Sequence, residues 1–192
     1  SGAGRIGRIR MHPMTLQESG DSTGRASLSK LFEGEFEPSQ CPNGIEGLAE
    51  IAVRGGWPEE RLHDSTDAQI VVREYLESVF EQSVPRLGGD GSLARRLAFS
   101  LARNLGQSAK ISTLARDVYA SDAEDALSEA ERKSLAKHLD TLNRLFLVDE
   151  VPGWVPASRS PQRMRVKPKR YFADPSIAAA LLGMSPAALL QD

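Results

Sequence analysis

Residues 92–106 read SLARRLAFSLARNLG, and they predict the helix around which the rest of the chain is organised. The leucines of this stretch recur every four residues, so a helix of 3.6 residues per turn places them on one apolar stripe. They are Leu93, Leu97, Leu101 and Leu105. Ser92 is a typical N-cap residue, and Gly106 is typical of the residue that ends a helix. We therefore expect a helix over this range, with its leucines in the core.

Three further elements follow this helix, and their order is that of a winged helix. Ser112 is the expected cap of a short helix ending at Tyr119, and an acidic turn (121–126) precedes a long helix over 128–144. The long helix begins with the Ser-x-x-Glu pattern of a capping box, and residues 145–172 predict a loose two-stranded hairpin. The side chains expected inside are Leu114, Ala115, Val118, Leu135, Leu139, Leu142 and Phe146. The predicted fold class is mainly α, a winged-helix-like helical domain with a small β-hairpin.

A strand or loop segment precedes that domain. Residues 5–11 alternate apolar and basic side chains, which favours a short strand. Residues 13–30 are rich in Ser, Thr and Gly and predict an irregular connection, and SKLFEG (29–34) predicts a short helix.

A helical connector comes next. Helical periodicity is clear in residues 43–54, which end at a glycine pair, and in residues 65–82, where Ser65 or Thr66 is the expected cap. The apolar faces consist of Ile45, Leu48, Ala49, Ala52 and Val53 in the first helix and Ala68, Val71, Val72, Tyr75, Leu76, Val79 and Phe80 in the second. Trp57 lies between the two helices and is expected to fold onto the core.

The glycine-rich residues 88–91 suggest a division of the chain. We expect a connector over 41–91, a winged-helix-like domain over 92–182, and the start of a following segment over 183–192. Within the domain, Asp174-Pro175 predicts the N-cap and first residue of a last helix.

Composition narrows the function classes. The chain has 192 residues, a net charge of −2 and one cysteine, Cys41. A near-neutral chain has no global field that would draw it to nucleic acid or to an anionic membrane. One cysteine excludes an intrachain disulfide, and together with the scattered His12, His63 and His138 it predicts no metal site and no catalytic triad. We expect a cytoplasmic protein and a buried Cys41.

The opening residues match the dinucleotide pattern G-x-G-x-x-G through Gly2, Gly4 and Gly7. In a dinucleotide-binding protein a strand precedes these glycines, and a helix follows that binds the phosphate at its N-terminus. Here one residue precedes Gly2, and a strand-like segment follows. The sequence therefore predicts no dinucleotide site, and it contains no P-loop motif.

Five segments in order resemble the C-terminal region of bacterial and archaeal AAA-type ATPases. They are SGAGRIGRIRMHPMTLQESG (1–20), GGWP (55–58), LARNLGQSAKISTLARDV (101–118), LDTLNRLFLVDEVPGW (139–154) and KRYFADPSIAAALLG (169–183). In that family a P-loop core is followed by a domain of unknown function and by a part similar to PD-(D/E)XK nucleases. The resemblance implies that residues 1–40 are the tail of the ATPase core and a connector, that this chain is a fragment, and that ATP and Mg²⁺ belong to the parent protein.

The resemblance also places Arg5 near the position of an arginine that can reach a γ-phosphate and stabilise charge in the transition state. Arg8 and Arg10 are the alternatives for this role. The competing interpretation is that all three are solvent-facing charges on a half-exposed strand.

A basic stretch over 159–170 is the second candidate site. Its cations are Arg159, Arg163, Arg165, Lys167, Lys169 and Arg170, and Lys133 and Lys137 lie on one face of the long helix. A basic wing could straddle a phosphate backbone. It could equally bind an acidic partner, including the ATPase core, and carboxylates at the start of the long helix disfavour sequence-specific reading of DNA.

These patterns leave two functions open. The first is a non-catalytic module that couples ATP hydrolysis in the parent protein to an interaction surface, with the ATPase core of the same chain as its partner. The second is a winged helix that binds nucleic acid through the basic wing. No residue constellation supports a standalone enzyme, and no apolar run is long enough to predict a membrane span.

Overall fold

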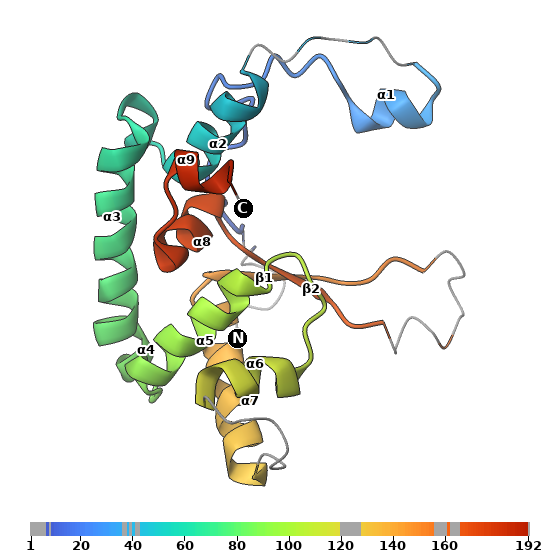
Figure 1. Cartoon of the computed structure of the whole chain (residues 1–192). Helices are drawn as coiled ribbons and strands as arrows, with labels where there is room; N and C mark the ends of the chain where they lie inside the picture. Colours follow the sequence, from blue (N-terminus) through green and yellow to red (C-terminus); the bar gives the residue numbers. More distant parts are fainter. Residues whose placement is uncertain are drawn as a thin grey trace.

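The computed structural model describes residues 7, 9–35, 38, 40, 43–119, 128–155, 161 and 166–191, the Arg61 side chain excepted. Over these residues the protein is mainly helical and has one two-stranded antiparallel sheet (Figure 1). The elements are α1 (Leu28–Phe32), α2 (Gly44–Arg54), the 3-10 turn η1 (Glu60–Leu62), α3 (Ser65–Ser78), the π-helical η2 (Val79–Ser83), α4 (Val84–Arg86), α5 (Gly91–Arg103), α6 (Ile111–Tyr119), α7 (Glu129–Arg144), β1 (Val148–Val151), β2 (Lys169–Phe172), α8 (Pro175–Leu182) and α9 (Pro186–Leu189).

Helix α5 lies at the centre of the core, as its leucine stripe predicts. It is packed between α8 on one side and α6 and α7 on the other (Figure 1). Leu93, Leu97 and Leu101 are buried, but Leu105 is 41% exposed because the helix ends at Arg103. Gly106 has a positive φ of 69°, and its N–H donates to the carbonyl of Arg170. The short loop after α5 therefore lies beside β2.

Three helices have N-termini that differ from the sequence prediction in the capping residue or in the first helical residue. Asp64 caps α3 in place of Ser65 or Thr66, and Asp90 caps α5 in place of Ser92. In both cases the carboxylate accepts two backbone N–H groups and carries a charge that favours the helix N-terminus. Helix α6 begins at Ile111, so Ser112 lies inside it.

The predicted helix over 65–82 continues further, through a π-helical turn, into α4. Pro85 has no N–H and its ring would clash with the carbonyl four residues earlier, so a regular α-helix cannot run through it. The π turn over Val79–Ser83 widens the helix just before that proline. At the start of α5, a Cβ on Gly91 would lie 2.0 Å from the carbonyl oxygen of Phe80, so a glycine is needed at this close approach.

One buried cluster includes side chains from both sides of residues 88–91. It contains residues of α3 and η2 together with residues of α5, α6, α7, the sheet and α8. The glycine-rich segment is a tight turn in which Leu87 and Gly88 donate to the carbonyls of Val84 and Pro85. This turn brings the connector helices and the later helices onto the same core.

Helix α7 and the hairpin form as predicted, with one exception. Ser128 and Glu131 form the capping box, and β1 pairs antiparallel with β2 so that Val148 lies opposite Phe172. The prediction that Phe146 points inward is wrong. Its φ is +57° and its side chain is 60% exposed, because the chain turns sharply between α7 and β1.

The turn after α2 is joined to the start of α8. Asp174 caps α8, as predicted, and it is only 2% exposed. Its carboxylate accepts the N–H groups of Gly56 and Ser176 and the hydroxyl of Ser176. A Cβ on Gly55 would lie 2.3 Å from this carboxylate, so only a glycine fits there. The partly buried Trp57 also packs on the core and donates from Nε1 to the Ser176 hydroxyl over 3.0 Å.

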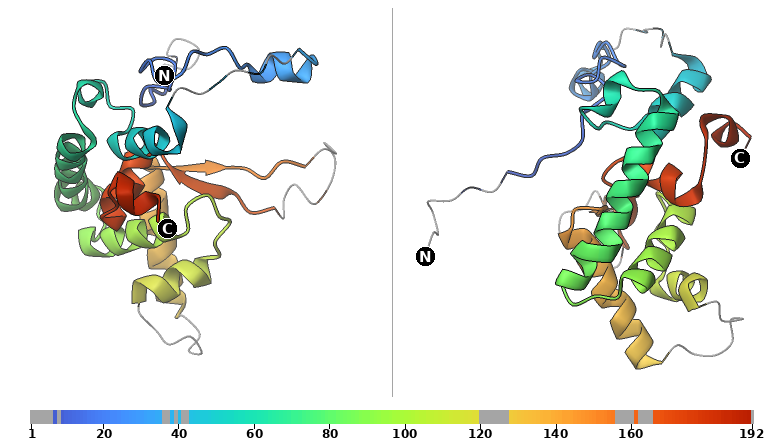
Figure 2. Two further views of the ribbon diagram at one scale, coloured as in Figure 1. Left: turned by 45° about the horizontal axis from the view of Figure 1, so that its top comes forward. Right: turned by 90° about the vertical axis from the view of Figure 1, so that its left-hand side faces the viewer.

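The N-terminal arm, residues 9–35, differs from the expected strand. Residues 9–14 have no regular secondary structure, and Ile9 is 97% exposed, because neither strand of the described sheet pairs with this segment. The predicted short helix is present as α1, which stands apart from the helical body (Figure 2). In α2, Ala49 and Val53 are buried as expected, whereas Ile45 and Leu48 are exposed.

Candidate functional site

The N-terminal arm contacts the base of the hairpin through Arg10. The guanidinium of Arg10 donates to the carboxylate of Asp149 on β1 and forms a salt bridge with it. The same guanidinium lies over the Phe146 ring, 5.1 Å from its centroid, in the geometry of a cation–π interaction. One arginine therefore connects the segment next to Arg5 with the first strand of the hairpin.

Buried neighbours and backbone hydrogen bonds hold Phe146 in this position. Leu147 and Val148, directly after it, are 0% and 2% exposed. The N–H of Leu147 donates to the Leu142 carbonyl, and the Leu147 carbonyl accepts the N–H of Ala173. The exposed ring is thus anchored by buried neighbours, which makes it a fixed contact surface for the arm.

A second contact fixes the arm four residues further along the chain. The N–H of Met14 donates to the carbonyl of Gly56 over 2.7 Å. A Cβ on Gly56 would lie 2.4 Å from the Met14 carbonyl oxygen, so the two backbones approach as closely as a glycine allows. Because Gly56 also donates to Asp174, the arm, the α2–η1 turn and the start of α8 are joined in one network.

A pocket of about 260 Å³ lies between the two contacts. The arm forms one wall, and the side chains of Trp57, Tyr75, Leu145, Phe146 and Ile177 contribute to the others. The Trp57 and Tyr75 rings pack with their centroids 5.2 Å apart, and burial raises the pKa of the Tyr75 phenol. The arm therefore covers a largely apolar hollow of the helical body.

Of the three arginines proposed to reach a nucleotide, the structure describes Arg10 alone. Arg5 and Arg8 lie outside the described residues, and Arg10 is engaged by Asp149 and Phe146. Cys41 and the acidic turn over 121–126 also lie outside them.

The cations of the basic stretch differ in their surroundings. Arg159, Arg163 and Arg165 lie outside the described residues. Arg170 is engaged, because its Nε donates to Glu150 over 2.8 Å and its Nη1 donates to the Ala109 carbonyl over 3.0 Å. Lys167 and Lys169 are exposed.

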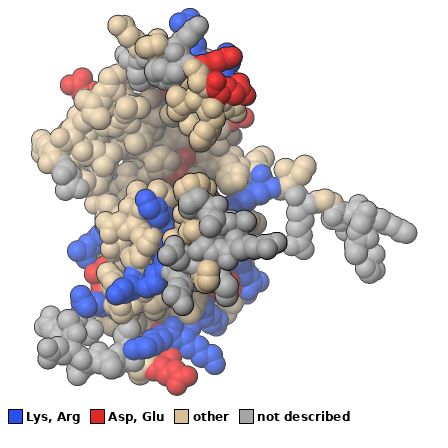
Figure 3. Space-filling model, turned by 90° about the vertical axis from the view of Figure 1, so that its right-hand side faces the viewer, with Lys and Arg blue, Asp and Glu red and all other residues tan. Residues whose placement is uncertain are grey.

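The two lysines of α7 differ in the same way. Lys133 is exposed, whereas the ammonium of Lys137 donates to the carbonyl of Gly88 in the turn before α5. Figure 3 shows that Lys and Arg side chains gather on the half of the molecule that holds α5, α6 and α7, beside the hairpin. Lys133, Lys137, Lys167 and Lys169 of the predicted set are therefore all exposed, and Lys137 is the one whose ammonium binds a backbone carbonyl.

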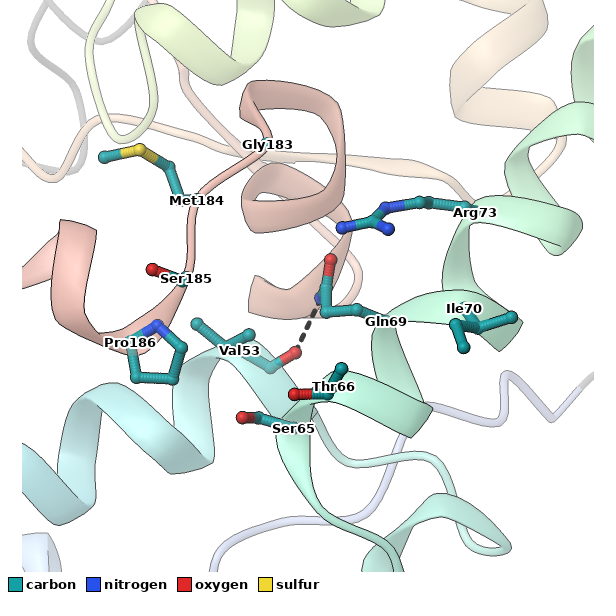
Figure 4. Close-up of a pocket in the computed structure, with 10 residues that line it drawn as sticks. All are labelled: Val53, Ser65, Thr66, Gln69, Ile70, Arg73, Gly183, Met184, Ser185 and Pro186. Atoms are coloured by element: carbon teal, nitrogen blue, oxygen red, sulfur yellow. Dashed lines mark hydrogen bonds between the residues drawn. The ribbon is translucent and has the colours of Figure 1, made fainter.

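A second pocket, of about 290 Å³, was not predicted from the sequence. It lies between α2, α3 and the turn joining α8 to α9 (Figure 4). Gln69 could have pointed to this pocket, because it is a polar residue within the mainly apolar buried face of α3, which also includes Ser65 at the start of the helix. Its oxygen Oε1 is buried without a hydrogen-bond partner.

The described residues lack both a metal-binding cluster and a membrane-spanning helix. They contain no group of three or more His, Cys, Asp or Glu side chains that could hold a metal ion. They also contain no helix that combines the length and the apolar character needed to cross a membrane.

The fold and these sites define a helical domain with a small antiparallel hairpin and an N-terminal arm. The chain belongs to the family described as Domain of unknown function (DUF8612), which matches residues 45–188. A comparison with curated proteins and a comparison with solved structures each gave no match.

Proposed function

We propose that the chain is the non-catalytic C-terminal part of a AAA-type ATPase and couples nucleotide hydrolysis to an interaction surface. The motif order described above supports the parent class. The observation that carries the coupling role is the contact of Arg10 with Asp149 and Phe146, because it connects the arm, which follows Arg5 in the sequence, to the hairpin.

The pairing of the loop after α5 with β2 supports a winged-helix module in this role. The loop after α5 runs beside β2: Gly106 donates to the Arg170 carbonyl, and Arg170 donates to the Gln107 carbonyl. In a winged helix, a segment that pairs with the hairpin is followed along the chain by two helices and then by the hairpin. The loop after α5, the helices α6 and α7, and the strands β1 and β2 occur in this order. In this proposal α6 and α7 are its helix pair, and the basic stretch over 159–170 is its wing.

The geometry suggests how nucleotide state would reach the wing. Five residues span at most about 18 Å, so Arg5 stays within that distance of the Arg10 backbone. A shift of Arg5 on loss of the γ-phosphate would be transmitted along the arm to Asp149. The Met14–Gly56 bond limits how far the arm can slide, so the movement would act on β1.

The first test is the coding sequence around this chain. The proposal requires a P-loop of the form G-x-x-x-x-G-K-[ST] in the same protein, before the residue numbered Ser1 here. If the complete reading frame contains no such motif, the proposal fails.

The second test measures coupling in that complete protein. We expect amide hydrogen exchange in the hairpin to differ between the states bound to ADP and to a non-hydrolysable ATP analogue. Arg10→Ala should abolish the difference, whereas the matched control Arg25→Ala, which changes an exposed arginine of the same arm, should preserve it. Equal exchange in both nucleotide states of the unaltered protein would refute coupling. Arg5→Ala tests catalysis separately, and an unchanged ATPase rate would remove Arg5 from it.

The second candidate function is binding of a nucleic-acid backbone by the wing. Lys167 and Lys169, which are exposed in and just before β2, favour binding of nucleic acid, as does the gathering of basic side chains in Figure 3. We expect duplex DNA to bind at low salt, and the double variant Lys167→Ala/Lys169→Ala to reduce the slope of log affinity against log salt by about 2. Arg25→Ala/Lys30→Ala is the charge-matched control. An absence of binding at low salt would exclude this function.

A further inference from the structure

The pocket between α2, α3 and the α8–α9 turn combines apolar walls with polar side chains. Val53, Ile70, Met184 and Pro186 supply the apolar surface (Figure 4). The polar side chains of the pocket are those of Ser65, Thr66, Gln69, Arg73 and Ser185. Gln69 and Arg73 are four residues apart on α3 and so lie on the same face of the helix. The volume of about 290 Å³ lies at the small end of the range for ligand pockets.

The amide of Gln69 is held in one orientation and presents its oxygen without a partner. Its Nε2 donates to the carbonyl of Val53 over 2.7 Å and to the carbonyl of Ser176 over 3.1 Å. Two carbonyl acceptors require the NH₂ group at that end, so the oxygen must occupy the other. Figure 4 shows this oxygen directed away from Val53, toward the Arg73 side of the pocket. Gln69 is only 3% exposed, and Oε1 has no hydrogen-bond partner.

An unpartnered buried acceptor is unusual, because the carbonyl loses its water on folding without gaining a hydrogen bond. Arg73 is exposed, and no salt bridge or hydrogen bond joins its guanidinium to another described residue. The pocket therefore offers a hydrogen-bond acceptor that lacks a donor and, beside it, a cation that lacks an anion.

From this unpaired acceptor and this unpaired cation we infer that the pocket binds a small ligand with three features. They are a carboxylate, an N–H or O–H donor next to it, and an apolar group. The carboxylate pairs with Arg73, whose planar guanidinium suits bidentate binding. Oε1 of Gln69 is enclosed, so the side chains around it move on binding and this oxygen then accepts the donor. The apolar group packs against Met184 and Pro186. A peptide C-terminus and a small acylated amino acid share this chemistry. The inference is independent of the ATPase proposal.

N-acetyl-L-leucine is a suitable probe, because it combines a carboxylate, one amide N–H and one apolar side chain. We expect titration of the ¹⁵N-labelled protein to shift the Gln69 side-chain amide signals and to give a dissociation constant of about 1 mM. N-acetyl-L-leucine amide lacks the carboxylate, and N-acetyl-N-methyl-L-leucine lacks the donor. Each of these two compounds should bind at least about tenfold more weakly than N-acetyl-L-leucine. An unchanged spectrum with N-acetyl-L-leucine at 20-fold the expected constant, that is about 20 mM, would overturn the inference.

Protein variants test the same contacts from the other side. Arg73→Gln should weaken the probe about tenfold, Arg73→Lys should retain part of the affinity, and Arg86→Gln, a change of an exposed arginine on α4, should retain all of it. These surface changes leave the core intact. If Arg73→Gln and Arg86→Gln weaken binding equally, the probe is responding to net charge and the assignment is wrong.

A second experiment distinguishes a peptide C-terminus from a small acylated amino acid as the ligand. If the ligand is a peptide C-terminus, acetyl-Ala-Ala-Leu with a free carboxylate binds at least as tightly as N-acetyl-L-leucine. If the ligand is a small acylated amino acid, the added residues weaken binding. Both results support the site, and failure of both compounds refutes it.

Discussion

The helical body and the N-terminal arm use their apolar residues in opposite ways. In the body, which comprises α2 to α9 with the sheet, one cluster buries leucines, valines and alanines from nearly every element. In the arm, Ile9, Met11 and Phe32 are 97%, 92% and 90% exposed, and Ser19 is the buried residue of the described arm. The body is therefore held by apolar burial, and the arm is not.

A few polar contacts hold the arm instead. Arg54 on α2 binds the Asp21 carboxylate over 2.5 Å, and the Asn43 side chain donates to the Asp21 carbonyl over 3.0 Å. Together with the Met14 and Arg10 contacts, they connect the arm to three places on the body. Contacts of this kind can open locally without unfolding the core, as a segment that transmits movement requires.

The largest effect is expected where the body depends on burial alone. Leu97→Ala removes a side chain that is 0% exposed at the centre of α5 and should lower the free energy of unfolding by about 3 kcal/mol. Leu105→Ala is the matched control. It changes a leucine of the same predicted stripe that is 41% exposed, and should cost less than about 1 kcal/mol. Urea denaturation of both variants measures the difference, and equal losses would contradict the central position of α5.

A smaller effect is expected where the body combines burial with polar contacts. Asp174→Ala removes the acceptor of three hydrogen bonds from a site that is 2% exposed, and should lower the free energy of unfolding by about 2 kcal/mol. Asp64→Ala removes an exposed N-cap from α3 and should cost about 1 kcal/mol. Thermal denaturation ranks the two variants. A larger loss for Asp64→Ala would show that Asp174 acts only as a helix cap.

The body was predictable from the sequence because its elements follow local rules. Apolar residues at intervals of three and four predicted α2, α3, α5, α6 and α7, and the capping box of α7 and the Asp174 cap were correctly predicted. The errors arose at the helix ends. Asp64 and Asp90 each lie one or two residues before a serine that is an equally good N-cap candidate. Which of the two residues caps the helix depends on the backbone conformation. Phe146 fits the helical periodicity of α7, but the helix ends two residues earlier.

The candidate sites were predictable only in part, since their contacts join residues far apart in the chain. Arg10 and Asp149 are separated by 139 positions, and no local pattern links them. The basic residues of the 159–170 stretch can be read from the sequence, but the hydrogen bond from Arg170 to Glu150 follows from strand register. Gln69 fits a surface residue as well as a buried one, and its unpartnered oxygen appears only when α2 and α8 are in place.

The contact between Asp21 and Arg54 tests whether the arm opens independently of the body. The side chains are 17% and 18% exposed, and a double-mutant cycle of Asp21→Asn and Arg54→Gln should give a coupling energy of about 1 kcal/mol. The readout is hydrogen exchange of Ser19 and Ser22, whose amides donate to carbonyls within the arm. These amides should exchange faster in Asp21→Asn, with exchange in α5 unchanged. Equal acceleration in α5 would show that arm and body open as one unit.

The smallest effect is expected at His63, a surface site of the body that depends on electrostatics. Its Nδ1 lies 3.0 Å from Oε2 of Glu60, and this hydrogen bond and charge, with smaller contributions from Asp67 and Asp64, raise the pKa of His63. A raised pKa in the folded state favours the protonated form, so the stabilising contribution is complete below the ordinary pKa of 6.5 and disappears as the pH rises through the raised value.

NMR titration of the His63 ring protons measures this shift directly. Glu60→Gln should lower the pKa toward its ordinary value, and Asp67→Asn should lower it by a smaller amount, because the Glu60 carboxylate is both the hydrogen-bond partner and the nearest charge. If Asp67→Asn has the larger effect, the histidine responds to the general field at the start of α3 and the Glu60 contact does not form in solution.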